Sequence, residues 1–330
     1  MTYNYDETLK SEANAFDSQI IERVKNGHIP DLQNCEDCDY FYNNSWRRKS
    51  FVQLDFVEQF NLIKNSISDY FSQQESKKIR ILEVGCGPGF MSLELARNGF
   101  DTIGLDISSD CIAVAINTAE KYSKCHKKNL HYVCTDILSF AEQNSDKFEV
   151  ILFVGALHHF PDQAQIHALC SQMLVNGGLF ICHEPVRDKI DKSNAVISSL
   201  ITTILSKCGL YYDNTNSAPA ELAAMQKYIE EKYKMLRYES DSGEKLQSVN
   251  DNEAGYSEMY PYLESNYQRI VFEWRYGLFH ELIGGLRLGS EELNSEVASI
   301  IKSFDEIMCK EGIINSTEFF YVGRIDKNSI

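Results

Sequence analysis

The sequence predicts an α/β fold, in which helices cover both faces of a doubly wound, mostly parallel sheet. Two observations support this prediction. From Lys78 onward, short apolar runs alternate with segments of helical periodicity, which is the pattern of successive β-α-β units. A glycine-rich turn follows the first of these runs, as expected where a buried strand passes directly into a helix.

Five strands are predicted in the alternating region, residues 76–186. They are Arg80–Val84, Thr102–Leu105, Leu130–Thr135, Glu149–Val154 and Leu179–Glu184. The helices between them are expected to begin near Gly89, Ser108, Leu138 and Asp162. Because Asn176-Gly177-Gly178 is rich in turn-forming residues, we expect a turn just before the fifth strand.

Further segments are predicted on both sides of this core. Residues 1–75 are expected to form a helical cap, since apolar side chains recur every three or four positions between Ser50 and Phe71. Residues 187–266 are expected to form a helical lid over a substrate site, and residues 267–330 to complete the sheet. The elements expected in this last part are strands at Ile270–Tyr276 and Glu318–Arg324 and a helix at Glu291–Cys309.

The charge balance limits the classes of partner. The chain has 330 residues, with 32 Lys and Arg against 48 Asp and Glu, so its formal net charge is −16. Binding to a nucleic-acid backbone requires a basic surface, so no nucleic-acid partner is expected. The longest apolar stretch, Ala195 to Leu205, is shorter than the roughly 20 residues that span a bilayer. We therefore expect a cytoplasmic protein without a membrane span, in which residues 195–207 pack internally or form a homodimer face.

The turn after the first strand carries the clearest chemical signal. Gly85, Gly87 and Gly89 let the backbone pass close to a ligand, and the following helix offers unpaired N–H groups. Asp106 ends the next strand, 21 residues after Gly85, where a carboxylate can accept hydrogen bonds from ribose hydroxyls. The spacing G-x-G-x-G differs from the G-x-G-x-x-G of dinucleotide-binding loops. Glu83, two residues before the first glycine, favours a ligand with an ammonium group and no pyrophosphate.

These motifs resemble those of the class I S-adenosylmethionine-dependent methyltransferase family. The family's first motif, E-x-G-x-G-x-G, is matched by Glu83 and the three glycines, and its second by Asp106. Its third is matched by Asp136, and its fourth by residues 153–162, which resemble the L-H-H-x-P-D version found in many small-molecule methyltransferases. The resemblance implies a Rossmann-like, seven-stranded sheet whose last strand is antiparallel.

The resemblance also implies a cofactor, S-adenosyl-L-methionine, with S-adenosyl-L-homocysteine as product and no metal. The positions it assigns to cofactor binding are Glu83, Gly85, Cys86, Gly87, Gly89, Asp106, Ile107, Asp136, Ile137, Phe153 and Val154. The backbone of the glycine loop would run alongside the methionine part of the cofactor. Asp106 would hold the ribose, with Ile107 packing on the adenine. Asp136 would accept from the adenine amine, with Ile137 beside it, and Phe153 and Val154 would line the floor near the sulfonium.

Acid and base candidates are placed at the ends of the fourth and fifth strands, where ligands bind in open α/β sheets. These candidates are His158, His159, His183, Glu184 and Arg187. A histidine can act as a base near neutral pH, which matters for a hydroxyl or carbon nucleophile but not for a neutral amine. The alternatives are structural: a histidine ring that closes the pocket, and an ion pair of Glu184 with Arg187 that shapes the loop.

We therefore expect methyl transfer by in-line displacement to an O, N or C nucleophile of a small organic molecule. The alternatives are a protein methyltransferase and a cofactor-binding homologue without methyl transfer. Cys35 and Cys38 have zinc-like spacing, but two further ligands are missing from the pattern, so no metal site is expected. Trp46-Arg47-Arg48 is a candidate lid or anchor for an anionic substrate.

Overall fold

The structure is a computed structural model. The residues it describes are 5–25, 54–72, 78–121, 129–212, 218–239, 248 and 254–327. The predictions made for Cys35, Cys38 and Trp46–Arg48 lie outside these residues. None of the helices in the described part of the chain is both long and apolar enough to cross a bilayer.

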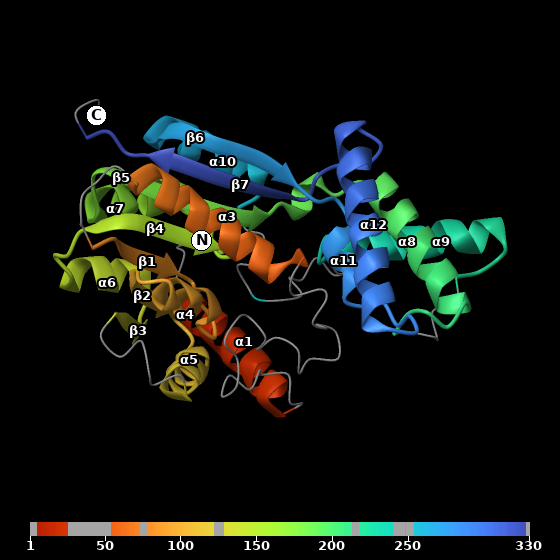
Figure 1. Cartoon of the computed structure of the whole chain (residues 1–330), viewed down its shortest axis with the longest axis horizontal. Coiled ribbons are helices and arrows are strands. Elements are labelled where there is room, and N and C mark those ends of the chain that lie inside the picture. The colour runs from red at the N-terminus through yellow and green to blue at the C-terminus, as the bar shows by residue number, and fades with distance from the viewer. Residues whose placement is uncertain are drawn as a thin grey trace.

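A seven-stranded sheet with the strand order β3-β2-β1-β4-β5-β7-β6 forms the centre of the molecule (Figure 1). Its strands are β1 (Arg80–Val84), β2 (Asp101–Asp106), β3 (Leu130–Cys134), β4 (Phe148–Val154), β5 (Leu174–Pro185), β6 (Gln268–Arg275) and β7 (Glu318–Arg324). Strands β1 to β5 pair in parallel, whereas β7 is antiparallel to both of its neighbours. The predicted fold class, sheet and antiparallel last strand are thus confirmed.

Most predicted strand ends lie within two residues of the observed ones, but the start of the fifth strand differs by five residues. Strand β5 begins at Leu174, so the glycines expected in a turn ahead of it lie inside the strand. Leu174 pairs with Phe148 and Leu179 with Val150, so four residues of β5 lie opposite a single residue of β4. Gly177 has a φ of 76° in this irregular segment. The turn-forming residues therefore produce a bulge that interrupts the pairing with β4 and does not end the strand.

Helices cover both faces of the sheet. The helices are α1 (Tyr5–Lys25), α3 (Phe56–Phe71), α4 (Phe90–Arg97), α5 (Ser109–Lys121), α6 (Ile137–Gln143), α7 (Gln163–Met173), α8 (Lys192–Lys207), α9 (Leu222–Leu236), α10 (Tyr256–Asn266), α11 (Phe279–Ile283) and α12 (Glu291–Lys310). One core joins the strands to α6, α7 and α10, and the other joins them to α3 and α4. Neighbouring strand residues such as Ile81 and Leu82 point into opposite cores, because side chains alternate along a strand.

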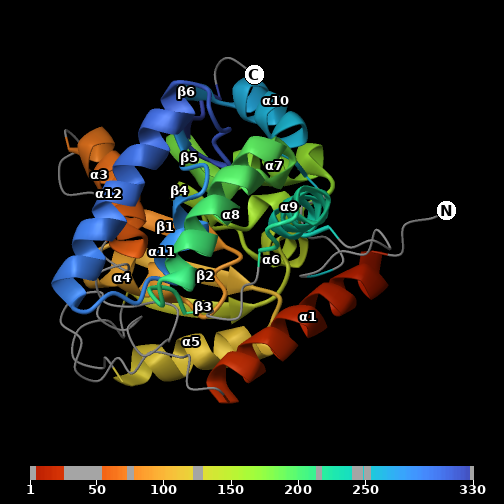
Figure 2. The same ribbon diagram turned by 90° about the vertical axis from the view of Figure 1, so that its right-hand side faces the viewer.

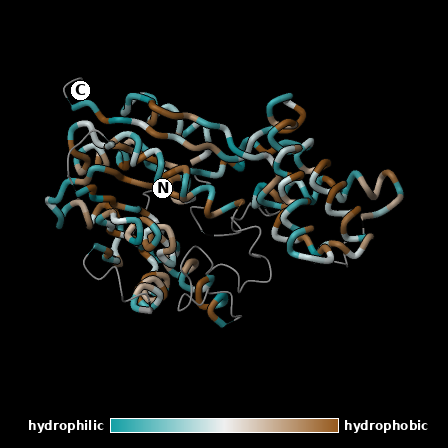
Figure 3. The backbone as a smooth tube through the Cα atoms, in the orientation of Figure 1, coloured by the Kyte–Doolittle hydropathy of each residue, from teal (hydrophilic) through white to brown (hydrophobic). Residues whose placement is uncertain are grey.

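The predicted helix ending at Phe71 is α3, which begins at Phe56 and buries Phe60, Ile63 and Ile67 on the sheet. Figure 3 shows that the central strands of the sheet are largely hydrophobic, which agrees with burial on both faces.

The helices of the predicted regions 187–266 and 267–330 do not form two separate groups in the structure. Helices α8 and α9 lie with α11 and α12 in a helical group at one end of the molecule, beyond the sheet (Figure 1). Helix α10, by contrast, packs on the sheet through Met259 and Leu263. Helix α1 lies against α5, near the carboxyl ends of the first strands (Figure 2).

Candidate functional site

A cavity of about 490 Å³ lies at the carboxyl ends of β1, β2 and β4. This volume is in the range of small-molecule and cofactor sites. Helix α1 forms its roof through Thr8, Leu9, Glu12, Phe16, Gln19, Ile20 and Arg23, and α3 contributes Phe56 and Gln59 to its side. Among the described residues of 187–266, none lines this cavity. The roof therefore comes from the N-terminal helix, as far as the described residues show.

The glycine loop after β1 forms the floor of the cavity. Gly85 has a φ of 73°, and a Cβ added there would lie 2.6 Å from the Cβ of Ala156, so a larger residue would not fit. Gly87 has a φ of 51°, but a Cβ added there would meet no atom within 4 Å. The backbone at Gly87 is therefore constrained in conformation yet open to close approach by a ligand.

Asp106 connects the end of β2 to this loop. Its Oδ2 accepts a hydrogen bond from the Gly87 N–H at 2.7 Å, and its Oδ1 accepts one from the Ser108 N–H at 2.8 Å. Burial raises the pKa of this carboxyl above its ordinary value, although both hydrogen bonds oppose the shift. Asp106 therefore shapes the loop as well as lining the cavity.

The charge of the cavity wall is predominantly acidic. Glu12, Glu83, Asp106 and Asp136 line it, against a single guanidinium from Arg23 among the described lining residues. Glu83 accepts a hydrogen bond from Ser92 Oγ. Burial raises the pKa of Glu83 to about 7, because the carboxylate is removed from water. Such a wall fits a ligand with positive charge, and S-adenosyl-L-methionine carries a sulfonium and an ammonium group.

Asp136 also has a local structural task. Its Oδ1 accepts from the N–H groups of Leu138 and Ser139 at 2.9 and 3.0 Å, which caps the N-terminus of α6.

The structure brings eight of the eleven predicted cofactor positions to the cavity. These are Glu83, Gly85, Cys86, Gly87, Asp106, Ile107, Asp136 and Val154. The other three are Gly89, Ile137 and Phe153, which do not line it. Gly89 precedes α4, and Phe153 is fully buried, with its ring 5.4 Å from that of Phe180.

The five acid and base candidates separate into three places. His159 alone among them lines the cavity. Its Nδ1 lies 2.9 Å from Glu12 Oε1, and its ring stands edge-on to Phe16 of α1. His158 turns away, because its Nδ1 lies 2.7 Å from Oε2 of the buried Glu184. Adjacent residues in the sequence thus face different environments.

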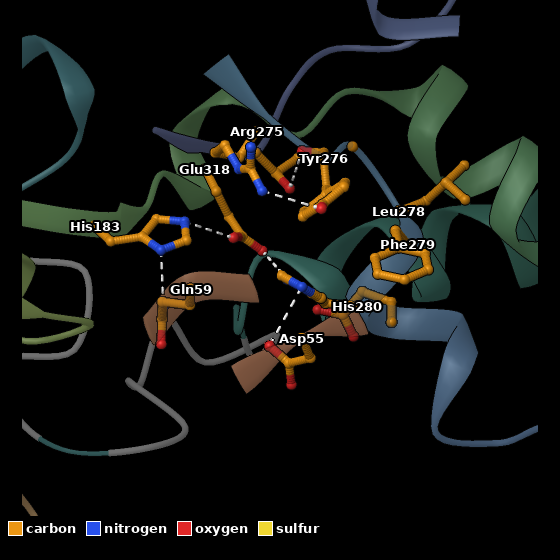
Figure 4. A network of polar contacts seen from close by, with 12 residues as sticks. Asp55, Gln59, His183, Arg275, Tyr276, Leu278, Phe279, His280 and Glu318 are labelled. Carbon is orange, nitrogen blue, oxygen red and sulfur yellow. Dashed lines mark hydrogen bonds and ion pairs between the residues drawn. The ribbon is translucent and has the colours of Figure 1, made fainter. Parts of the chain in front are cut away.

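His183 and Arg187 lie outside the cavity wall. His183 Nδ1 lies 2.7 Å from Gln59 Nε2, and its Nε2 lies 3.2 Å from Glu318 Oε2 (Figure 4). Glu318 Oε1 in turn lies 2.5 Å from Nδ1 of His280. Arg187 pairs with Glu281 at 2.8 Å, so its ion pair is with α11 and not with the predicted Glu184.

Sequence reasoning missed Glu12, Phe16 and Gln59 of the cavity wall. They lie on helices that carry no motif, and they reach the cavity through packing of distant segments. The periodicity of α3 predicted a helix, but not that Gln59 would contact His183 near the end of β5. A group of three or more His, Cys, Asp or Glu side chains able to hold a metal ion is not found among the described residues.

Known proteins resemble this chain over the same region. A family model described as a methyltransferase domain matches residues 75–253. The ubiquinone biosynthesis O-methyltransferase of Coxiella burnetii (strain RSA 493 / Nine Mile phase I) is 34% identical over 123 residues, covering 37% of this chain and 50% of that protein. The corresponding protein of Psychrobacter cryohalolentis is 25% identical over 175 residues, covering 51% and 67%. The chain spans about half the length of the first of these curated relatives.

Solved structures give weaker matches. The plantazolicin methyltransferase BpumL, solved with a desmethyl plantazolicin analogue and S-adenosylhomocysteine, has a TM-score of 0.46 at 13% identity, covering 99% of this chain and 100% of that chain. A Haemonchus contortus phosphoethanolamine N-methyltransferase has a TM-score of 0.43 at 11% identity, covering 82% and 53%. Because the family model matches more than half of the chain, this protein belongs to the methyltransferase-domain family.

Proposed function

We propose that the protein transfers the methyl group of S-adenosyl-L-methionine to a small organic acceptor and releases S-adenosyl-L-homocysteine. The observation that carries this proposal is the acidic cavity at the ends of β1, β2 and β4, which α1 partly covers. A concave cavity of about 490 Å³ suits a cofactor and a small acceptor better than the flat surface of a macromolecule.

The cavity wall suggests how the chain would hold the cofactor. The open backbone at Gly87 would lie along the methionine part, and Glu83 would face its ammonium group. Asp106 would accept from the ribose hydroxyls, while Ile107 and Asp136 would contact the adenine. Val154 would lie near the sulfonium. The bound cofactor supplies an activated methyl group, so the protein mainly aligns the reactants and excludes water.

His159 is the proposed general base when the acceptor is a hydroxyl group. Its contact with Glu12 Oε1 favours a proton on Nδ1, which leaves the lone pair of Nε2 available. The names of the curated relatives, ubiquinone biosynthesis O-methyltransferases, support an oxygen acceptor. Phe56, Gln59 and Phe160 would form the remaining wall around it.

The first test is calorimetric titration with S-adenosyl-L-methionine and S-adenosyl-L-homocysteine. We expect micromolar binding of both, and Asp106→Asn should weaken it about 10- to 100-fold because a charged hydrogen-bond acceptor is lost. Asp146→Asn is the matched control, since Asp146 is 62% exposed and lies before β4. A folded protein that binds neither compound would contradict the proposal.

The second test follows methyl transfer from labelled S-adenosyl-L-methionine to a panel of phenols, catechols and amines. With a hydroxyl acceptor, His159→Gln should lower kcat by roughly 100-fold or more, which is typical of a lost general base, while cofactor affinity is preserved. His131→Gln on β3 is the control, because His131 is exposed. An unchanged kcat in His159→Gln would remove the base assignment but not the methyltransferase proposal.

A further inference from the structure

Gln59 of α3 contacts both the cavity and a chain of polar side chains behind it. Its side chain lines the cavity, and its Nε2 lies 2.7 Å from Nδ1 of His183 on β5 (Figure 4). On the other side of the imidazole ring, Nε2 of His183 lies 3.2 Å from Oε2 of Glu318 on β7. Gln59 thus joins this polar chain to the cavity wall.

The polar chain returns to the start of the same helix. Oε1 of Glu318 lies 2.5 Å from Nδ1 of His280, and Nε2 of His280 lies 3.4 Å from Oδ1 of Asp55 (Figure 4). Asp55 immediately precedes α3, and its carbonyl oxygen accepts a hydrogen bond from the Gln59 N–H at 2.9 Å. Because the first turn of α3 is held at two points, the side chain of Gln59 is positioned before any ligand binds.

The proton on His183 decides which way the amide of Gln59 is turned. A carboxylate favours a proton on the imidazole nitrogen that faces it, so a neutral His183 carries its proton on Nε2, toward Glu318. Its Nδ1 then has a lone pair, which accepts a hydrogen bond from the NH₂ group of Gln59. Among the described residues, none donates to Oε1 of Gln59, and this atom is not sealed from solvent. The amide oxygen is therefore left for a ligand.

The strand order places Gln59 on the acceptor side of the cavity. The residues proposed to hold the cofactor follow β1, β2 and β3, which lie on one side of β4. His183 belongs to β5, on the other side, and pairs in register with Val154, which is proposed to lie near the sulfonium. Gln59 therefore reaches the cavity near the reacting methyl group and away from the adenine. Phe56, three residues earlier on α3, adds an apolar side chain to the wall.

We propose that Gln59 selects acceptors that carry a second hydrogen-bond donor, which its Oε1 accepts while His159 faces the hydroxyl group that is methylated. This inference rests on the proposed methyl transfer and names the substrate class. The acceptor is a hydroxyl compound with an apolar body against Phe56 and a further O–H or N–H group toward Gln59. His183 is a positioning residue, because it sets the direction of the amide and does not line the cavity.

An amide held in one orientation discriminates between acceptors better than a free one. A free glutamine can turn to offer either its oxygen or its NH₂ group, whereas the amide held by His183 offers its oxygen. An acceptor that lacks the second donor leaves this oxygen without a partner. One neutral hydrogen bond of this kind corresponds to a preference of about 10-fold in affinity.

The first measurement reads the proton positions on His183 in the protein without ligands. Long-range ¹H–¹⁵N NMR distinguishes a proton on Nε2, on Nδ1 or on both nitrogens, and His183→Asn assigns the signal. We expect a neutral ring with its proton on Nε2 at pH 7. A proton on Nδ1 would overturn the proposal, because the amide would then turn its oxygen toward His183 and its NH₂ group toward the cavity.

The second measurement compares the binding of phenol with that of catechol, resorcinol and hydroquinone, by calorimetry of the S-adenosyl-L-homocysteine complex. These dihydroxy compounds place the second hydroxyl at different distances from the first, and at least one should bind about 10-fold more tightly than phenol. Gln59→Met should remove this preference, whereas Gln59→Glu keeps an acceptor oxygen and should retain it. Asn65→Leu is the matched control, because Asn65 is exposed on the same helix.

Two results of this titration would overturn the proposal: phenol binds as tightly as every dihydroxy compound, or Gln59→Met keeps the wild-type preference. Circular dichroism and the affinity for S-adenosyl-L-homocysteine show that each variant is folded and holds the cofactor product. Failure of the proposed function gives a different result, since the wild-type protein would not bind S-adenosyl-L-homocysteine at all. The proton positions on His183 and the same titrations of the free protein then still decide whether Gln59 offers its oxygen to a donor.

Discussion

His158 Nδ1 lies 2.7 Å from Oε2 of Glu184, and Glu184 is fully buried. The other carboxylate oxygen, Oε1, accepts from the N–H groups of Ala156 and Leu157 at 3.1 and 2.9 Å. Glu184 at the end of β5 therefore holds the turn after β4 in place. The same turn carries Ala156 and His159 into the cavity wall, so this buried pair supports the site from behind.

Glu184→Gln should destabilise the protein. An amide retains one acceptor but turns an NH₂ group toward N–H groups, so we expect a loss of about 2–4 kcal/mol in the free energy of unfolding, measured with urea. Glu231→Gln on α9 is the control, because Glu231 is 65% exposed and should change stability by less than about 0.5 kcal/mol. Equal stability of the two variants would show that the pair does not support the turn.

Glu83 should release a proton when a cationic cofactor binds. Its pKa of about 7 leaves it partly protonated at neutral pH, and a nearby ammonium group favours the carboxylate. Calorimetric titrations with S-adenosyl-L-methionine at pH 7 in buffers of different ionisation enthalpy should show release of up to about half a proton per cofactor. Glu83→Gln should abolish this release. Proton uptake in the wild type would contradict the placement of Glu83 beside the ammonium group.

The titration of Glu83 should also be visible without any ligand, in the pH dependence of the free energy of unfolding. The pKa of Glu83 is raised from 4.5 in the unfolded chain to about 7 in the folded protein. Its contribution is therefore fully present below pH 4.5 and is lost as the pH rises through 7. Glu83→Gln should gain up to about 3 kcal/mol relative to the wild type between pH 5 and pH 8. A difference that does not change with pH would mean that Glu83 is not the titrating group.

Local patterns predicted most of the fold. Apolar runs, the glycine loop and Asp106 are signals that lie within a few residues of each other, and the strands they predict occur in the structure. The bulge at Val175–Gly178 was not predicted, because the same glycines serve a turn or a bulge depending on the register with β4. Tertiary pairing, which no local pattern shows, decides between them.

The sequence predicted the cavity residues that lie at the ends of strands, but not those that lie on helices. Eight predicted positions line the cavity, and each lies on or just after β1, β2, β3 or β4. Glu12 and Gln59 come from helices whose docking on the cavity depends on contacts far apart in the sequence. Likewise, the sequence places His158 and His159 together, and only the position of Glu184 assigns them to different environments.

Helix α1 should open more readily when Asp17 loses its charge. Asp17 Oδ1 accepts from Ser108 Oγ at 2.5 Å and from the Asp110 N–H at 3.0 Å, which fastens the helix to the start of α5. Asp17→Asn should increase hydrogen exchange of the α1 amides about 5- to 10-fold, equivalent to about 1–1.4 kcal/mol. It should also speed dissociation of S-adenosyl-L-methionine by a similar factor.

Glu22→Gln is the matched control for this change, because Glu22 lies on the same helix and is exposed. Exchange that rises equally in both variants would mean that the helix is held by its apolar contacts and not by Asp17.

Glu318→Gln should destabilise the protein at neutral pH and less so in acid. Burial raises the pKa of Glu318, but the neighbouring His280 and His183 outweigh it, so the pKa is held well below its ordinary value of 4.5. A carboxyl with a lowered pKa contributes stability above 4.5 and loses it as the pH falls toward the folded-state pKa. We expect a loss of about 1–3 kcal/mol at pH 7 that shrinks below pH 4.5, with the partly exposed Glu264→Gln unaffected. A loss that stays constant down to pH 3 would mean that Glu318 acts through packing, and that its charge does not hold His183 and Gln59 beside the cavity.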